Sequence, residues 1–221
     1  MAEEEIVSEP PAGSRGDGRK GGEDPAVISS LIAAFSSEDG LVRETARRRL
    51  IHMGRPAVAP LMEALAVDDP QTRWEAAKAL GYLADPDSAP ALVRALRDEE
   101  FGVRWLAAEG LIPLGFEGLE PLLRALIEHS DSAWLRQGAH HVLRVLSRRG
   151  FREVLQPVLA ALEGLEPSLE VPLAAEDARD ALARARKQQG VQRARARTNK
   201  RRFSMSRKEP DRPGEPERKL Q

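Results

Sequence analysis

The residue types that most often carry catalysis or bind metals are scarce in this chain of 221 residues. It has no cysteine, which excludes a disulfide, a thiolate metal site and a cysteine nucleophile. Of its four histidines, His140 and His141 are adjacent and would point about 100° apart on a helix, so they cannot share one ion. The sequence also has no phosphate-binding glycine loop and no Ser-His-Asp arrangement. We therefore expect no catalytic residue, no metal site and no cofactor, with His141 as a polar lining residue.

Two tryptophans are the residues best suited to bind a partner. Trp74 and Trp105 each follow an arginine directly. Helical geometry projects both rings about 160° away from the buried centre of their helices. Surface tryptophans are enriched at binding hot spots, so the pair is expected to form a docking patch. The alternative is that each ring covers a neighbouring Arg or Lys stem in a cation–π contact.

The arginines beside these tryptophans belong to an internal repeat. Arg43, Arg73, Arg104 and Arg136 are 30, 31 and 32 residues apart, and each is followed by Ala three positions on and Leu four beyond that. A repeat of this period is typical of a solenoid. Nothing in residues 27–163 alternates with period two, so each repeat is predicted to be a helical hairpin.

Prolines and glycines indicate where these helices begin and end. Three of the first helices are predicted to start at a proline, and the second helices to end near a glycine. The prolines are Pro60, Pro121 and Pro157, and the glycines are Gly54, Gly81, Gly115 and Gly150. One hairpin cannot cover its own apolar face, so neighbours must stack. The predicted fold class is all-α, an α-α superhelix (solenoid) of about five helical hairpins.

The predicted solenoid spans residues 27–187. Its units are 27–56, 57–87, 88–117, 118–150 and 151–187. The fifth unit is atypical, as a capping repeat would be, because only Ala178 and Leu182 of its second helix are in register. Residues 1–26 and 188–221 are predicted to be disordered, the latter because Gly190 should end the last helix.

The units share the pattern acid-x-x-Val-Arg-x-x-Ala-x-x-x-Leu-Gly, preceded by Pro-Leu-x-x-Ala-Leu. This pattern resembles HEAT repeats of the phycobilisome-lyase-like class. The resemblance implies a protein-interaction scaffold or accessory subunit whose second helices line a concave face. It also implies an alternative, a lyase-like subunit that handles a bilin. Another HEAT family, deoxyhypusine hydroxylase, binds iron on His-Glu pairs, and no His-Glu pair occurs here.

Helical register divides each second helix between a partner-binding side and a seam. The residues predicted to bind a protein partner on the concave face are Trp74, Trp105, Lys78, Glu109, Gln137 and His141. At the seam, arginines are predicted to pair with acid-rich turns, because a planar guanidinium satisfies carboxylate and carbonyl oxygens together. This ladder consists of Asp39, Arg43, Asp69, Arg73, Glu100, Arg104 and Arg136. The alternative is that these arginines bind a ligand.

Charge is segregated along the chain, although the formal net charge is only -1. The stretch from Ala183 to Lys208 has eleven basic residues and no acid, and the remaining 23 basic and 35 acidic residues leave the rest at about -12. The stretch is predicted to be a solvated tail or to contact nucleic acid, an acidic partner or anionic lipid. The residues of this basic tail that we single out are Arg193, Arg195, Arg197, Lys200, Arg201 and Arg202.

The start of the chain and its hydropathy bear on location. Met1 is followed by Ala and three Glu, where a secretory signal would be basic and then apolar. No apolar run approaches the ~20 residues of a membrane-spanning helix. We expect a cytoplasmic monomer.

Overall fold

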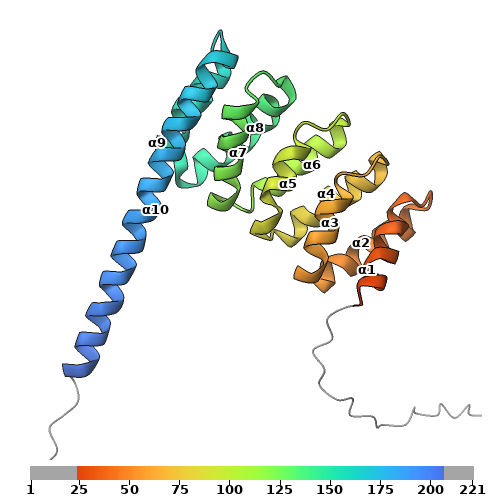
Figure 1. Cartoon of the computed structure of the whole chain (residues 1–221), viewed down its shortest axis with the longest axis horizontal. Helices are drawn as coiled ribbons and strands as arrows, with labels where there is room; N and C mark the ends of the chain where they lie inside the picture. The colour runs from red at the N-terminus through yellow and green to blue at the C-terminus, as the bar shows by residue number, and fades with distance from the viewer. Residues whose placement is uncertain (1–23, 207–221) are drawn as a thin grey trace, which may run out of the picture.

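The computed structural model describes residues 24–206, with side chains described as far as Gln188, and this part of the chain is helical without a strand. Four helical pairs follow one another (Figure 1). Their first helices are α1 (Pro25–Ala33), α3 (Val58–Ala64), α5 (Ala89–Ala95) and α7 (Phe116–Glu128). Their second helices are α2 (Gly40–Met53), α4 (Pro70–Leu83), α6 (Phe101–Leu111) and α8 (Ala133–Leu146).

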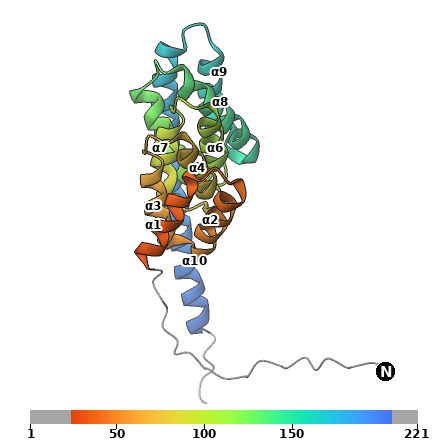
Figure 2. The same cartoon turned by 90° about the vertical axis from the view of Figure 1, so that its right-hand side faces the viewer.

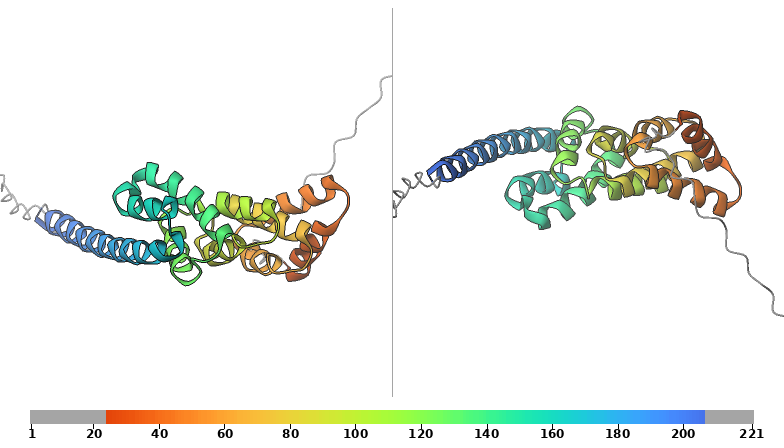
Figure 3. Two further views of the ribbon diagram at one scale, coloured as in Figure 1. Left: turned by 90° about the horizontal axis from the view of Figure 1, so that it is seen from above. Right: turned by 90° about the horizontal axis from the view of Figure 1, so that it is seen from below.

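The pairs stack into two rows, one of first helices and one of second helices. In the second-helix row, α4 packs on α2 and α6, and α6 packs on α8. In the first-helix row, α1 packs on α3 and α5 on α7. Figures 2 and 3 show the two rows lying side by side along the molecule. The predicted all-α solenoid is confirmed.

The repeated leucine and alanine form the core of the second-helix row. The leucines Leu50, Leu80, Leu111 and Leu143 are fully buried, as are Ala76, Ala107 and Ala139 beside them. Burying one leucine side chain stabilises the fold by about 1.5–3 kcal/mol. Alanine at the neighbouring position keeps the helices close, so leucines from adjacent units meet in one continuous core.

We had expected Gly81 to end a helix, but it does not. It lies inside α4, and a Cβ atom there would come within 3.3 Å of the Gly110 Cα atom on α6. Its missing side chain therefore permits a close approach of two helices. The helix ends instead at Ala84, in the left-handed conformation with φ 48°. Gly54 does end α2 at positive φ, as predicted. Helix α6 instead ends at Leu111, and Gly115, also at positive φ, is the residue before the start of α7.

The three predicted proline starts are also wrong, and Pro60 is the third residue of α3. Pro121 and Pro157 lie inside α7 and α9 (Arg152–Glu163) rather than at their first turns. In both helices the chain turns at the glycine before it, Gly115 or Gly150, so the helix begins earlier. Each proline then costs its helix one backbone hydrogen bond.

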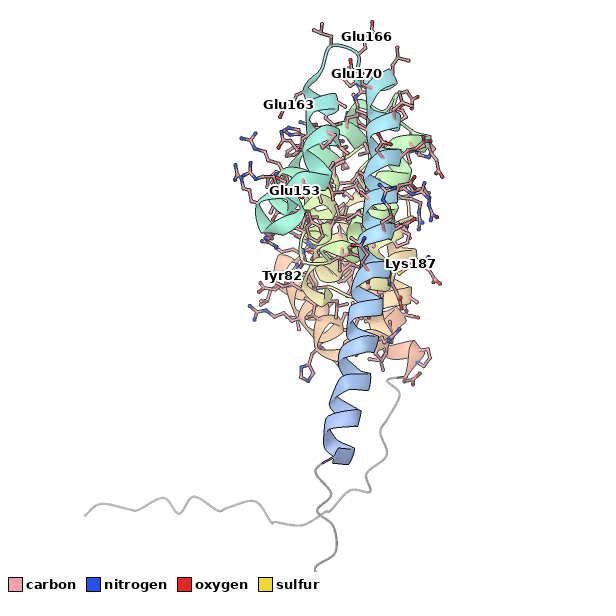
Figure 4. All side chains as sticks on the ribbon, turned by 90° about the vertical axis from the view of Figure 1, so that its left-hand side faces the viewer. Tyr82, Glu153, Glu163, Glu166, Glu170 and Lys187 are labelled. Atoms are coloured by element: carbon pink, nitrogen blue, oxygen red, sulfur yellow. The ribbon has the colours of Figure 1, made fainter. Side chains whose placement is uncertain are left out.

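The fifth pair is exchanged between the rows. The five-residue π-helical segment η4 (Ser147–Phe151) joins α8 to α9, and α9 packs on α8, in the second-helix row. The last helix, α10 (Pro167–Ser206), packs on α7 and on α9. Its buried stripe is Val171, Ala175, Ala178 and Leu182. Figure 4 shows α9 and α10 side by side across the end of the solenoid, where they cover its last apolar face.

The predicted ends of the solenoid differ from the observed ones. Helix α1 begins at Pro25 with Asp24 as its cap, two residues before the expected start. Helix α10 continues through Gly190 to Ser206, although we had expected it to end at that glycine. A single glycine costs a helix about 1 kcal/mol, and the Ala, Arg, Gln and Lys around it favour helix. Residues 1–23 and 207–221, also predicted to be disordered, lie outside the described residues.

The seam between units is built on the repeated arginine. In each unit its Nη1 atom donates hydrogen bonds to carbonyls five or six residues earlier, in the turn that precedes the second helix. The pairs are Arg43 with Ser37 (2.6 Å) and Glu38 (3.0 Å), Arg73 with Val67 (3.1 Å) and Asp68 (2.7 Å), Arg104 with Asp98 (2.7 Å) and Glu99 (2.7 Å), and Arg136 with Ser130. The guanidinium thus donates hydrogen bonds to turn carbonyls that lie outside the helices.

Arg73 also reaches across to the next unit. Its Nε and Nη2 atoms donate to the two Asp98 carboxylate oxygens at 2.7 and 3.0 Å, and Nη2 also donates to Glu99 at 3.2 Å. These carboxylates raise the pKa of the Arg73 guanidinium. The side chains of Arg73 and Asp98 are both buried, so each depends on the other for compensation of its charge.

The acids four residues before the arginines have a different role. Asp39 and Asp69 accept hydrogen bonds from backbone N–H groups of the first helical turn, as N-caps. Glu100 holds the same position without a capping hydrogen bond from its side chain. The seam therefore uses acids of the turn itself, such as Asp98, for ion pairing and reserves the following acid for the helix end.

Replacement of Arg73 by Ala should destabilise the protein by about 3–5 kcal/mol, because it leaves the buried Asp98 carboxylate without its partner. Equilibrium unfolding in urea, followed by circular dichroism, measures the loss. Arg55→Ala is the matched control, since the Arg55–Asp87 pair is exposed and should contribute less than about 1 kcal/mol. Equal losses in the free energy of unfolding for the two substitutions would contradict the proposed contribution of the buried Arg73–Asp98 pair.

Acid should weaken the cap of α4. The pKa of Asp69 lies below its ordinary 3.8, chiefly because the Thr72 hydroxyl donates to it at 2.5 Å, with backbone N–H groups adding to the effect and burial opposing it. A carboxyl with a lowered folded pKa stabilises the fold above the unfolded value, and this contribution is lost as the pH falls through the folded pKa. Asp69→Ala should cost about 1 kcal/mol at pH 7 and progressively less below pH 3.8.

Urea unfolding of wild type and Asp69→Ala between pH 7 and pH 2.5 checks this expectation. A difference between the two proteins that stays constant across that range would show that the Asp69 charge contributes nothing to the cap.

Candidate partner-binding surface

A row of aromatic side chains crosses from α6 to α8 on the second-helix side. The Arg104 guanidinium carbon lies 4.5 Å from the Trp134 ring centroid and 5.7 Å from that of Phe101. The Phe101 and Trp105 centroids are 6.5 Å apart, and those of Trp105 and His141 are 5.0 Å apart. We call these five residues the aromatic row.

The aromatic row is exposed although its rings are large. Phe101 is 62%, Trp105 47% and Trp134 46% exposed. The spacing within the helices produces this, because Phe101 and Trp105 are four residues apart on α6, and Trp134 and His141 are seven apart on α8. Contiguous apolar surface of this kind marks interaction sites in soluble proteins.

Three of the predicted partner-binding residues meet in this row. His141 Nε2 lies 2.8 Å from Glu109 Oε1, and its ring packs against Trp105. Glu109 follows Trp105 by one helical turn, so α6 supplies two of the three groups. The imidazole therefore lies between a carboxylate and an indole.

Trp74 is placed differently from Trp105. It is partly buried, packs against the core, and lies over Gly102 of α6, where a Cβ atom would come within 3.0 Å of its ring. The Lys78 ammonium sits 4.5 Å from the Trp74 centroid. For Trp74 the geometry is thus the cation–π contact that was the alternative interpretation, whereas Trp105 is exposed.

The neighbouring helix explains this difference between equivalent tryptophans. Gly102 stands two residues before the seam arginine of α6, and Trp134 stands at the same position of α8. The indole of Trp74 can therefore pack closely against a glycine of the next unit. Trp105 has a tryptophan at the corresponding place, and its ring contacts Phe101 and His141 instead.

A groove of about 580 Å³ lies beside Trp74, between α2, α4 and α6. A buried ion pair forms part of its wall: Glu75, only 3% exposed, accepts a hydrogen bond from Arg47 Nη1. Gln71 Nε2 and Arg43 Nε both lie 3.4 Å from the other Glu75 oxygen, and this Arg43 nitrogen is buried without a hydrogen bond. The remaining lining residues are Gly40, Glu44, Pro70, Trp74, Lys78, Glu100, Gly102 and Val103.

A second, smaller groove connects this region with the aromatic row. It has a volume of about 310 Å³ and forms where Gly81 and Gly110 bring α4 and α6 close together. Lys78 lines both grooves, and Glu109 lines the smaller one while binding His141. The predicted residues Trp74, Lys78, Glu109, Trp105 and His141 therefore follow one continuous surface. Gln137 is exposed on α8.

Sequence reasoning missed several residues of this surface. Phe101 and Trp134 were not among the predicted partner-binding residues, and Trp134, at the start of its helix, was interpreted as packing against the turn. An aromatic at the first position of α6, where α2 and α4 begin with Gly40 and Pro70, was the available signal. Arg47 and Glu75 were missed because their pairing joins two units and shows in neither repeat alone.

The structure bears on other kinds of site as well. The guanidinium groups of Arg43, Arg73, Arg104 and Arg136 all hold turn carbonyls, which leaves their Nη1 atoms committed to the seam. Among the described residues no group of three His, Cys, Asp or Glu side chains could hold a metal ion. No helix within residues 24–206 is long and apolar enough to cross a membrane.

The repeats of this chain are similar to those of a known protein family. A family model described as HEAT repeats matches residues 58–144, from α3 to α8, which includes the aromatic row. No curated protein matches the chain. A crystal structure described as an engineered protein is 19% identical, covers 71% of this chain and 79% of its own, and has a TM-score of 0.38. The narrower phycobilisome-lyase-like class stays a prediction, while the match over stacked helical pairs supports a HEAT-repeat protein.

Proposed function

We propose that this protein is a scaffold or accessory subunit that binds a protein partner on its second-helix face, with the aromatic row as the centre of contact. The observation that carries the proposal is the half-exposed Trp105, held between Phe101 and His141. HEAT repeats generally mediate protein–protein interaction, which agrees with this assignment.

The aromatic row is held in place by contacts within the chain as well as exposed to solvent. A side chain that is already fixed before binding loses little conformational entropy when a partner covers it. Arg104 lies near the rings of both Phe101 and Trp134, and His141 is tied to Glu109. Rigid aromatic groups flanked by Arg are the composition of binding hot spots.

The two grooves extend the proposed contact toward α2. Their walls carry both signs of charge, and Lys78, Arg43, Glu44 and Glu100 all line the larger groove. We infer that the partner places an apolar anchor on the aromatic row and a polar segment along the grooves. Mixed charge of this kind sets register and specificity rather than affinity.

Trp105→Ala should weaken partner capture by about 30-fold or more, because truncation of a hot-spot tryptophan typically costs ~2 kcal/mol. Its fold should persist, since the ring is half exposed. Affinity purification from the native host with wild type and variant side by side measures the loss, and circular dichroism with thermal unfolding measures stability. Leu165→Ala, at a side chain 99% exposed beyond α9, is the matched control.

Trp74→Ala serves as a contrast in the same experiment. Since Trp74 packs over Gly102 and against the core, its loss should lower the melting temperature, unlike that of Trp105. Capture of the same proteins by wild type and Trp105→Ala, with both folded, would contradict the proposed function.

A further inference from the structure

The last helix extends well beyond the solenoid that it caps. The buried stripe of α10 ends at Leu182. Among the side chains described as far as Gln188, Arg186 is the last that contacts another helix. Arg186 lies 5.4 Å from the Phe116 ring centroid and 3.6 Å from Glu117 of α7. Helix α10 then runs on to Ser206, and Figures 1 and 3 show this end projecting away from the other helices. We call residues 187–206 the arm.

The arm is long and carries one sign of charge. Twenty helical residues span about 30 Å, close to one turn of B-form DNA. Acidic residues are absent from Ala183 to Lys208, where eleven residues are basic, whereas the rest of the chain carries about -12. A cationic rod therefore projects from an acidic body, and the body repels the polyanions that the arm attracts.

The composition of the arm argues against a membrane surface or another helix as its target. Its only large apolar residues are Val191, Phe203 and Met205, which do not recur at helical spacing. A helix that lies on a membrane needs an apolar face, and a coiled-coil partner needs an apolar seam. The side that packs on the solenoid as far as Leu182 carries basic positions from Arg186 onward.

The basic positions spread around more than half of the helix and include two opposite sides. Counting 100° per residue, one set falls within about 20° and a second, roughly opposite, within about 60°. The first set is Arg184, Arg195 and Arg202, the second is Arg186, Arg193, Arg197 and Lys200, and Lys187 and Arg201 lie between the two sets. A flat acidic surface can meet only one side of a helix. A nucleic-acid groove has phosphates along both walls and meets both sides.

We propose that the arm of α10 binds the phosphate backbone of a duplex nucleic acid by entering a groove. Binding is then largely independent of base sequence, because charge neutralisation of phosphates carries no sequence information. This site is separate from the aromatic row, since α10 packs on α7 in the first-helix row.

Fluorescence anisotropy of labelled 20-bp DNA and RNA duplexes with the full chain tests the proposal. Affinity should fall by about 100-fold or more between 50 and 200 mM salt, with a log–log slope near −0.9 per neutralised phosphate on DNA. The DNA and RNA arms of the experiment identify which groove is preferred. Absence of binding to both duplexes at 50 mM salt overturns the proposal.

Two variants with the same change in net charge locate the binding. In the first, Arg193, Arg195, Arg197, Lys200, Arg201 and Arg202 are replaced by Ala, which preserves helix propensity. In the second, six exposed arginines of the solenoid and of η4 are replaced by Ala, namely Arg48, Arg49, Arg94, Arg97, Arg144 and Arg148. The first variant should lose at least about 100-fold in affinity at 50 mM salt, and the second should bind as wild type or more weakly by a small factor. Equal losses overturn the assignment to the arm.

Further measurements separate the competing targets. Wild-type binding to phosphatidylserine vesicles as tight as to the duplexes would overturn the proposal in favour of a membrane. Concentration-dependent self-association in sedimentation, lost in the arm variant, together with no duplex binding, would overturn it in favour of a second copy of this chain. Trp105→Ala should leave duplex affinity unchanged, so failure of the proposed protein-binding function would be seen independently.

Discussion

The hydrogen bonds of the repeated arginine, Arg73 and its equivalents, to the turn before each second helix are the interaction on which the rest of the solenoid depends. Each arginine satisfies the carbonyls of a turn that has no regular hydrogen bonds of its own, and Arg73 also binds the next turn through Asp98. This fixes the rotation of each second helix about its axis. The residue that follows the arginine lies about 100° further around the helix, away from the buried core. Trp74 and Trp105 occupy this position.

The same register gives two different environments to equivalent residues. Trp74 rests on Gly102, and a lysine covers its ring. Trp105 stands where the next helix presents Trp134, and it remains half exposed against His141. A repeat places side chains in rows, and differences between neighbouring units decide which members of a row remain available for binding. The aromatic row is such a local departure from the repeat.

Most of the fold could be predicted from the sequence, because the repeated Arg, Ala and Leu specify seam and core in each of the first four units. Features that depend on one junction could not. The exchange of α9 and α10 between rows follows from a short π-helical turn around Gly150, and Gly81 permits close packing instead of ending a helix. Within the candidate surface, register predicted the positions of Lys78, Glu109 and His141. The Arg47–Glu75 pair required knowledge of which units touch.

The exchanged last pair separates the two surfaces for which we propose functions. Because α10 joins the first-helix row by packing on α7, its arm leaves the solenoid from that row, while the aromatic row belongs to α6 and α8 in the other. Had α10 stacked on α8, its basic extension would have continued the partner-binding row, and one ligand would have obstructed the other. In the observed arrangement the two proposed surfaces belong to different helix rows, the aromatic row to α6 and α8 and the arm to α10 beside α7.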